Sequence, residues 1–259
     1  TYFYEIARKL GVDRLKETSE KFGLGKKVLD ETFNNEKKGL IPDTEWKKNN
    51  LGKGWVIGET LITGIGQGYT QTTPLQLCLM TAQLANGGFK IYPKIIVEKN
   101  SKSAEDIRVI INANRKDLDK NNKYNTETEI LGFLNKKKYE PLFKNSKNIK
   151  LVREAMFAST NEVRGTSYSS RIEDPKYQFA GKTGTSQVRR ITKEARELDL
   201  NTSEIPYNER DHALYIAFGP YKNPRYALSI VVEHGGSGSS TAAPIAKKLF
   251  KLIIDRHEL

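Results

Sequence analysis

The sequence predicts an α+β fold in which a helical region precedes an antiparallel sheet and a C-terminal helix packs on that sheet. The sheet is indicated by three stretches rich in β-branched and aromatic residues, at Tyr177–Val188, His212–Pro220 and Tyr226–Glu233. A short Tyr-Lys-Asn-Pro turn joins the last two stretches, which predicts an antiparallel hairpin. Apolar residues then recur at helical spacing and predict the terminal helix: Ala243, Ala246, Leu249, Phe250 and Ile253.

Two short helices are predicted at the start of the chain. Four apolar residues share one helical face in the first, which Gly11 ends: Phe3, Ile6, Ala7 and Leu10. The second runs from about Asp13 to Lys21. From Leu24 to Gly68 the sequence is rich in Gly, Asn and Lys, and we expect loops and short turns there.

The clearest helix start in the sequence is at Thr73. Thr73 is a suitable N-cap, Pro74 suits the first helical position, and Gln76 completes a capping box. The helix is expected to end at Asn86-Gly-Gly88. Four residues form its predicted apolar stripe: Leu75, Cys78, Ala82 and Ala85.

Two long polar segments interrupt this pattern. Residues from about Glu98 to Lys150 are dominated by Lys, Asn, Asp and Glu, and we expect a surface insertion (98–150). Leu151–Ala158 then resumes an amphipathic helix. The charged stretch Arg189–Asp211 is expected to form a long loop (189–211) between the first two strands.

The composition excludes several classes of function. The net charge is +12, but the lysines are spread through loops such as Asn135–Lys138 without interleaved aromatic residues, so we expect a solvated basic surface and no nucleic-acid partner. The single cysteine, Cys78, is expected to be a buried structural thiol. The three histidines are scattered, and neither a metal nor an organic cofactor is implied. No apolar run approaches the ~18 residues of a membrane span.

The residues Lys182-Thr183-Gly184-Thr185 lie within a predicted strand and carry the chemistry. Alternate side chains of a strand share a face, so Lys182 and Gly184 are expected on one face and both threonines on the other. A glycine lets another group approach the backbone closely. The N–H near Thr185 is then available to an acyl substrate or its oxyanion, and the hydroxyl groups can bind a carboxylate.

The context of this motif resembles a known family. Gly181-Lys-Thr-Gly-Thr-Ser-Gln187 is similar to the third active-site motif of penicillin-binding proteins and serine β-lactamases. Thr63-Gly-Ile-Gly-Gln-Gly-Tyr69, with Thr73-Pro-Leu-Gln76 and Ala85-Asn-Gly-Gly88, resembles the corresponding stretch of class B transpeptidases, above all those of the elongation type.

Both ends of the chain extend the resemblance. Val232-Glu-His-Gly-Gly236 and Ala242-Ala-Pro-Ile-Ala246 resemble the last strand and C-terminal helix of that family, and Thr1-Tyr-Phe-Tyr4 resembles the segment directly after its second motif. The blocks keep family order over nearly the whole chain. The chain is therefore identified as a member of the class B penicillin-binding proteins, with the penicillin-binding/serine β-lactamase-like transpeptidase fold.

The resemblance implies a role for each residue of the motif. Lys182 would set the electrostatics of a D,D-transpeptidase site, and Thr185 would supply a main-chain oxyanion donor, which makes these two the candidate catalytic residues. Thr183 and Thr185 would bind the terminal carboxylate of a D-Ala-D-Ala stem peptide or of a β-lactam, and Gly184 would keep the strand close to the acyl group. The strand would pair with the substrate backbone as an added strand. The family implies a membrane glycosyltransferase partner and a site at the periplasmic face of the inner membrane, anchored by an N-terminal segment outside this chain.

The nucleophile of this chemistry is missing from the sequence. A Ser-x-x-Lys is needed to activate the hydroxyl, and no serine of the chain has lysine three residues later. Ser146-Lys-Asn148 and Ser159-Thr-Asn161 match a second motif by letter but are out of family order. We therefore expect residues 1–259 to be the C-terminal part of one transpeptidase domain, inactive alone, with exposed apolar surface and a bare strand edge.

Two other functions remain open. A non-catalytic homologue could bind β-lactams or peptidoglycan without turnover, and an upstream Ser-x-x-Lys would exclude it. A serine β-lactamase would need a deacylating glutamate motif, which nothing in this sequence resembles.

Overall fold

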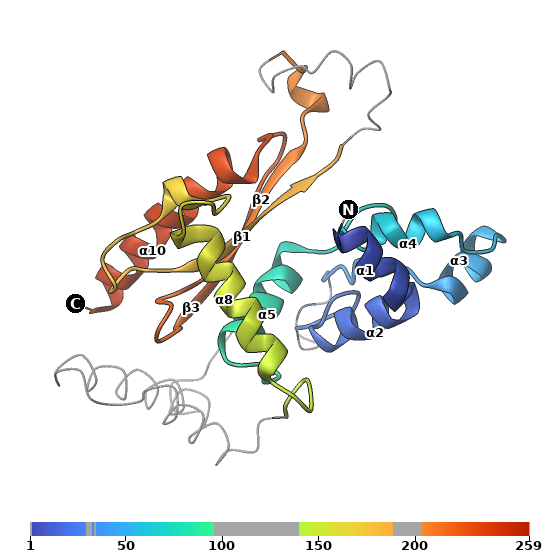
Figure 1. Ribbon diagram of the computed structural model, residues 1–259, viewed down its shortest axis with the longest axis horizontal. Helices are drawn as coiled ribbons and strands as arrows, with labels where there is room; N and C mark the ends of the chain where they lie inside the picture. Colours follow the sequence, from blue (N-terminus) through green and yellow to red (C-terminus); the bar gives the residue numbers. More distant parts are fainter. Residues whose placement is uncertain (1, 30–32, 34, 96–139, 189–203, 259) are drawn as a thin grey trace.

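A three-stranded antiparallel sheet forms the centre of the C-terminal half of the chain, in the order β1-β2-β3. The computed structural model describes residues 2–29, 33, 35–95, 140–188 and 204–258 (Figure 1). The strands are β1 (Ala180–Ser186), β2 (His212–Gly219) and β3 (Tyr226–Val232). Each lies within one of the three predicted stretches, and β2 and β3 form the predicted hairpin. The α+β prediction is confirmed.

Helices make up most of the remaining described elements, and the first four lie together beside the sheet region (Figure 1). None of the helices in the described ranges is both long and apolar enough to cross a membrane. The helices are α1 (Tyr2–Leu10), α2 (Val12–Lys21), α3 (Thr44–Leu51), α4 (Ile57–Thr63), α5 (Pro74–Ala85), α8 (Lys147–Asn161) and α10 (Ala243–Glu258), with the short turns η1 (Tyr168–Ser170), η2 (Tyr207–Glu209) and η3 (Gly238–Ala242, one π-helical turn).

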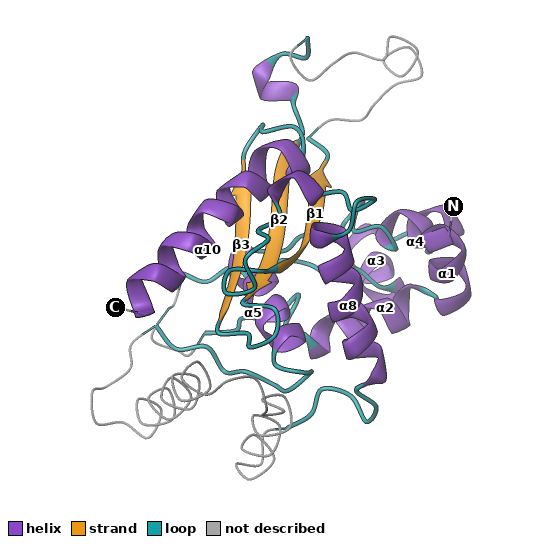
Figure 2. Cartoon of the chain, turned by 60° about the vertical axis from the view of Figure 1, so that its left-hand side comes forward, coloured by secondary structure: helices purple, strands orange, loops and turns teal. Residues whose placement is uncertain are grey.

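The sheet is covered on both faces because the side chains of β2 alternate between two cores. Ala213, Tyr215 and Ala217 are fully buried in a cluster with residues of α10, which runs along one face of the sheet (Figure 2). On the opposite face, Ile216 and Phe218 pack with residues of α5 and α8. α10 contributes Ala243, Ala246, Phe250 and Ile254 to the first core. The predicted face is therefore wrong at Leu249, which is 36% exposed, and at Ile253, which is only half-buried beside the fully buried Ile254.

α5 begins as predicted but buries a different set of residues. The Thr73 hydroxyl accepts from Gln76 N–H at 3.2 Å, and Gln76 Oε1 accepts from Thr73 N–H at 3.0 Å. Of the predicted stripe, Ala85 is buried, whereas Leu75, Cys78 and Ala82 are only half-buried, because α5 is covered on several sides. Gln76 and Gln83 are almost fully buried, and their amide groups donate to backbone carbonyls of surrounding loops, including that of Phe22 at 2.9 Å.

The interpretation of Leu24–Gly68 as loops and turns is wrong where α3 and α4 form. These helices have 8 and 7 residues, too short to show a helical repeat of apolar residues. Their sequence signal is in the capping groups instead. Asp43 Oδ1 accepts from Trp46 N–H at 2.6 Å at the start of α3, and Glu59 Oε2 accepts from Val56 N–H at 3.0 Å at the start of α4.

The C-terminal boundary of the predicted insertion (98–150) also needs correction. α8 begins at Lys147, and Ile149 is only 5% exposed in the core beneath the sheet. Pro141 forms an isolated bridge with Phe89. Residues 140–150 are therefore part of the folded domain, whereas 96–139 lie outside the described residues. The same holds for 189–203 of the predicted loop 189–211.

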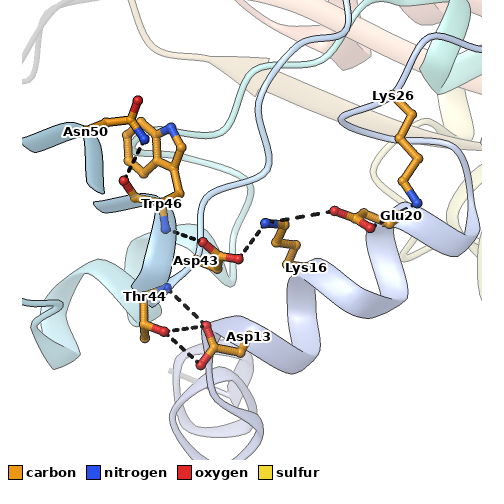
Figure 3. Close-up of polar contacts among 8 residues, drawn as sticks. All are labelled: Asp13, Lys16, Glu20, Lys26, Asp43, Thr44, Trp46 and Asn50. Carbon is orange, nitrogen blue, oxygen red and sulfur yellow. Dashed lines mark hydrogen bonds and ion pairs between the residues drawn. The ribbon is translucent and has the colours of Figure 1, made fainter. Parts of the chain in front are cut away.

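Polar contacts fix α2 against the start of α3 (Figure 3). Thr44 donates from its backbone N–H and its hydroxyl to Asp13, at 3.0 and 3.1 Å to Oδ1. Lys16 forms an ion pair with Asp43, the same carboxylate that caps α3. Burial raises the pKa of Asp43, but the Lys16 ammonium and the Trp46 N–H together outweigh it and leave the pKa lowered.

This contact predicts acid sensitivity. Because the pKa of Asp43 is lower in the folded than in the unfolded protein, the Asp43 carboxylate stabilises the fold. This stabilisation is present above the unfolded pKa of about 3.9 and is lost as pH falls through the lower folded-state pKa. The free energy of unfolding, measured in urea at pH 7 and pH 3, should decrease less with acid in Asp43→Asn than in the unaltered protein. Glu154→Gln, which changes an exposed carboxylate on α8, is the control. An equal acid response in Asp43→Asn and the unaltered protein would rule out this source of stability.

Candidate active site

The four residues of the predicted motif lie on β1, and their register gives the faces that the sequence predicts. Lys182 pairs with Ile216, which packs toward α8, and Thr183 pairs with Tyr215, which packs toward α10. Directly opposite residues of an antiparallel pair have side chains on the same face. Lys182 and Gly184 therefore lie on the α8 face, and Thr183 and Thr185 lie on the other.

Lys182 is an exposed residue whose ammonium folds back onto the neighbouring strand backbone. Its Nζ donates to the Thr183 carbonyl at 2.8 Å and lies 3.5 Å from the Thr183 hydroxyl. Burial lowers the pKa of Lys182. Within the described ranges, no carboxylate lies within ion-pair distance of it. An ammonium group with this environment gains most from an anion that binds beside it.

Hydroxyl groups continue from Thr183 to α8. The Thr183 hydroxyl lies 3.3 Å from that of Thr166, which lies 3.2 Å from that of Ser159. Sequence reasoning missed Thr166, and it treated Ser159 as part of a chance match. In that match, Asn161 has a structural role, because its Nδ2 donates to the Phe157 and Phe179 carbonyls at 3.0 and 2.9 Å.

Tyr215 holds the segment that carries Thr166 in place. Its hydroxyl lies 3.0 Å from that of Thr160 and 2.9 Å from that of Ser167, all in buried positions. Burial raises the pKa of Tyr215, although both hydrogen bonds oppose this. The ring crosses β1 over Gly181, where a Cβ would lie 2.3 Å from the tyrosine hydroxyl. Only glycine leaves room there, which explains the first residue of the motif block.

Gly238 packs closely on the backbone of Gly184, whereas the close approach that the sequence predicts in place of a Gly184 side chain stays a prediction, because a Cβ there would meet only Leu214 Cβ, at 3.3 Å. Gly238 of η3 lies so close that a Cβ on it would be 2.7 Å from Gly184 O and 2.5 Å from Leu214 O. The glycine-rich segment after β3 therefore packs its backbone against the middle of the motif.

Thr185 has a partner that the sequence did not indicate. Its side chain is exposed, and its carbonyl accepts from Gln67 Nε2 at 2.9 Å. Gln67 comes from the Thr63–Tyr69 block, where Gly66 and Gly68 have φ values of 76° and 78°. The flanking glycines are the only sequence signal that could have singled out Gln67. Among the described residues, β1 and β3 are the outer strands of the sheet and neither pairs with a further strand, as the expected bare edge requires. The Gln67 side chain donates to the β1 edge at this one carbonyl.

A largely apolar pocket of about 970 Å³ opens beside Lys182. Ser159, Thr166 and Lys182 contribute its polar rim. The apolar lining comes from α1, α5, α8, β2 and the residue that follows α2, and includes Phe3, Phe22, Met80, Leu84, Met156 and Ile216. The predicted apolar surface is therefore present, and it lies next to the motif.

The other residues singled out from the sequence have structural environments. His212 Nδ1 accepts from His234 N–H at 2.9 Å at the start of β2. Cys78 is half-buried, its Sγ lies 3.5 Å from the Ala227 carbonyl, and burial raises the pKa of its thiol. The sequence prediction of a buried structural thiol is therefore met only in part at Cys78.

Comparisons with known proteins give a uniform result. The family model of the penicillin-binding protein transpeptidase domain matches residues 1–251. The chain is 34% identical over 257 residues to the peptidoglycan D,D-transpeptidase MrdA of Salmonella typhimurium strain SL1344, across 98% of this chain and 36% of the relative.

Solved structures agree with the sequence relatives. The chain is similar to Pseudomonas aeruginosa PBP2 in complex with WCK 5153, with 33% identity and a TM-score of 0.69 over 97% of this chain and 46% of that one. It is also similar to Helicobacter pylori PBP2 in complex with MreC, with 28% identity and a TM-score of 0.73 over 100% and 38% of the two chains. The chain spans about a third of the length of its curated relatives and less than half of these solved chains.

Proposed function

Because the chain belongs to the penicillin-binding protein transpeptidase domain family, we propose that it forms the C-terminal part of an elongation-type peptidoglycan D,D-transpeptidase. The observation that carries this proposal is the environment of Lys182. Its ammonium, on a residue that remains exposed, has no carboxylate partner in the described ranges, and it adjoins the Thr183 hydroxyl on the motif strand.

The four motif residues have distinct roles in this reaction. Lys182 attracts the terminal carboxylate of the stem peptide, and the hydroxyls of Thr183 and Thr185 hydrogen-bond it. The Thr185 N–H stabilises the oxyanion that forms on the scissile carbonyl. Gly184, packed against Gly238, keeps this part of β1 fixed while the substrate backbone pairs with the strand.

The nucleophile comes from a part of the protein outside this chain. Its serine Oγ attacks the carbonyl carbon of the penultimate D-Ala, a C–O bond forms, and the C–N bond to the terminal D-Ala breaks. The serine proton leaves with the amino group of that D-Ala. The pocket beside Lys182 has the apolar lining and polar rim that suit a helix carrying Ser-x-x-Lys.

The partners and location rest on the same proposal. We expect peptidoglycan stem peptides and β-lactams as ligands, a membrane glycosyltransferase as partner, and the periplasmic face of the inner membrane as location, with an anchor outside residues 1–259. The H. pylori relative was solved in complex with MreC, so a counterpart of MreC is a further expected partner.

The function is tested with the protein encoded by the whole reading frame. A pentapeptide ending in D-Ala-D-Ala is supplied with an acceptor amine, and the release of D-alanine and the crosslinked product are measured. Both should appear together, and the peptide ending in L-Ala-L-Ala should give neither. Residues 1–259 alone should be inactive, since no serine in them has lysine three residues later.

Two other outcomes would replace the proposal. Peptide binding without D-alanine release would favour the non-catalytic homologue. Catalytic hydrolysis of a β-lactam without peptide crosslinking would favour a serine β-lactamase.

A further inference from the structure

Side chains donate to the edge of β1 that faces away from β2. The three accepting carbonyls belong to residues an even number of positions apart, so they point toward the same edge of the strand. All three donors are amide or ammonium groups of side chains. The bonds run from Asn161 Nδ2 to Phe179 O at 2.9 Å, from Lys182 Nζ to Thr183 O at 2.8 Å, and from Gln67 Nε2 to Thr185 O at 2.9 Å.

Gln67 is the donor best placed to move. Asn161 is also bonded to the Phe157 carbonyl on its own helix. Gln67 instead reaches β1 from a turn 118 residues earlier in the chain. The turn has Gly66 and Gly68 on either side of Gln67, both at positive φ, and a Cβ at Gly66 would meet nothing within 4 Å. The hydrogen bond from Gln67 to Thr185 O is itself exposed, so the side chain has room to leave the strand.

The base of this turn is nevertheless fixed. Gln67 N–H donates to the Ile62 carbonyl at 3.1 Å. Two residues later, the Tyr69 ring lies 5.2 Å from that of Trp46, and its hydroxyl lies 3.4 Å from Glu59 Oε1. The backbone of the turn is thus held beside β1, whereas the contact with Thr185 depends on a single side-chain hydrogen bond.

We propose that Gln67 occupies the position of a substrate strand at the Thr185 carbonyl, and that a ligand whose amide N–H pairs with this carbonyl must displace it. In an antiparallel pair the N–H and C=O of one residue face the same edge. The Thr185 N–H, the proposed oxyanion donor, therefore opens on the side where Gln67 lies. This inference rests on the proposed function, in which the substrate pairs with β1.

Displacement makes the site selective for the chemistry of its ligand. A ligand that offers an amide N–H replaces the lost hydrogen bond to Thr185 O, so the exchange is nearly neutral. A ligand without such an N–H gives no compensation and leaves Gln67 bound. Gln67 therefore acts as a specificity-determining residue. It weakens the binding of ligands that carry an amide N–H and hardly affects the binding of ligands that lack one.

The test compares two β-lactams on the protein encoded by the whole reading frame. One is a penicillin with an acylamino group, and the other has a hydroxyethyl substituent and no amide N–H. The second-order rate of acylation is measured for the unaltered protein, Gln67→Ala and the size-matched Gln67→Met. Both variants should react about threefold to tenfold faster with the penicillin, because one neutral hydrogen bond no longer opposes binding. The second β-lactam should react at an unchanged rate.

Gln71→Ala is the matched control, because Gln71 is an exposed glutamine four residues further on. It should change neither rate. Thermal melting identifies a variant that fails to fold, in which case the other Gln67 variant decides. Slower acylation with the penicillin, or an equal change with both ligands, would overturn the inference while leaving the proposed function intact. No acylation of the unaltered protein by either ligand would overturn both.

Discussion

Lys182→Met should lower the rate of acylation by penicillin about a hundredfold in the protein encoded by the whole reading frame. The variant removes the ammonium that adjoins the Thr183 hydroxyl at the rim of the pocket. Methionine keeps most of the side-chain volume of lysine, so a slower acylation rate can be attributed to the missing positive charge. Stopped-flow or quenched labelling with a fluorescent penicillin measures the rate.

The same variant should not be less stable at pH 7. Burial lowers the pKa of Lys182, which means that the charged side chain destabilises the folded state. This destabilisation is fully present below the folded pKa and disappears above the unfolded pKa of about 10.4. Removing the charge removes this destabilisation. Lys248→Met, on an exposed position of α10, should change neither rate nor stability. A Lys182→Met protein that is acylated at the normal rate would show that this residue has no part in the reaction.

Gly238→Ala should destabilise the fold by about 3 kcal/mol. The new methyl group would lie 2.5 Å from Leu214 O and 2.7 Å from Gly184 O, and both contacts are with backbone atoms in the middle of the β1–β2 pair. These atoms cannot rotate away, so η3 or the motif strand must shift. Because the shift would reach Gly184, acylation by penicillin should also slow.

Urea denaturation of Gly238→Ala is best compared with that of Gly54→Ala. A Cβ at Gly54 would meet nothing within 4 Å, and its φ is not in the positive region. The control should therefore have nearly normal stability. Equal stability of the two variants would mean that the close packing of η3 on β1 does not limit the fold.

The sequence predicted the strands and the helix start that can be recognised from residues close together in the chain. The three strands followed from runs of β-branched and aromatic residues, and the start of α5 followed from the spacing of Thr73, Pro74 and Gln76. The face of α10 was partly wrong. Ala243, Ala246, Phe250 and Ile254 are buried at intervals of three and four residues, whereas Leu249 lies beside that face and remains 36% exposed.

The site was predicted only where one strand carries it. Lys182 to Thr185 are contiguous, so alternation along β1 was enough to assign their faces. Gln67, Thr166 and Gly238 come from separate parts of the chain, and their contacts with β1 depend on tertiary packing that no local pattern encodes. The catalytic and binding roles of the four motif residues themselves stay predictions.

The most direct test of the proposed transpeptidase is to map the penicillin adduct on the protein encoded by the whole reading frame. Intact-mass spectrometry after penicillin treatment, followed by peptide mapping, locates the acylated residue. The account predicts one adduct, on the serine of a Ser-x-x-Lys that precedes residues 1–259. An adduct on a serine within this chain, or no adduct at all, would contradict it.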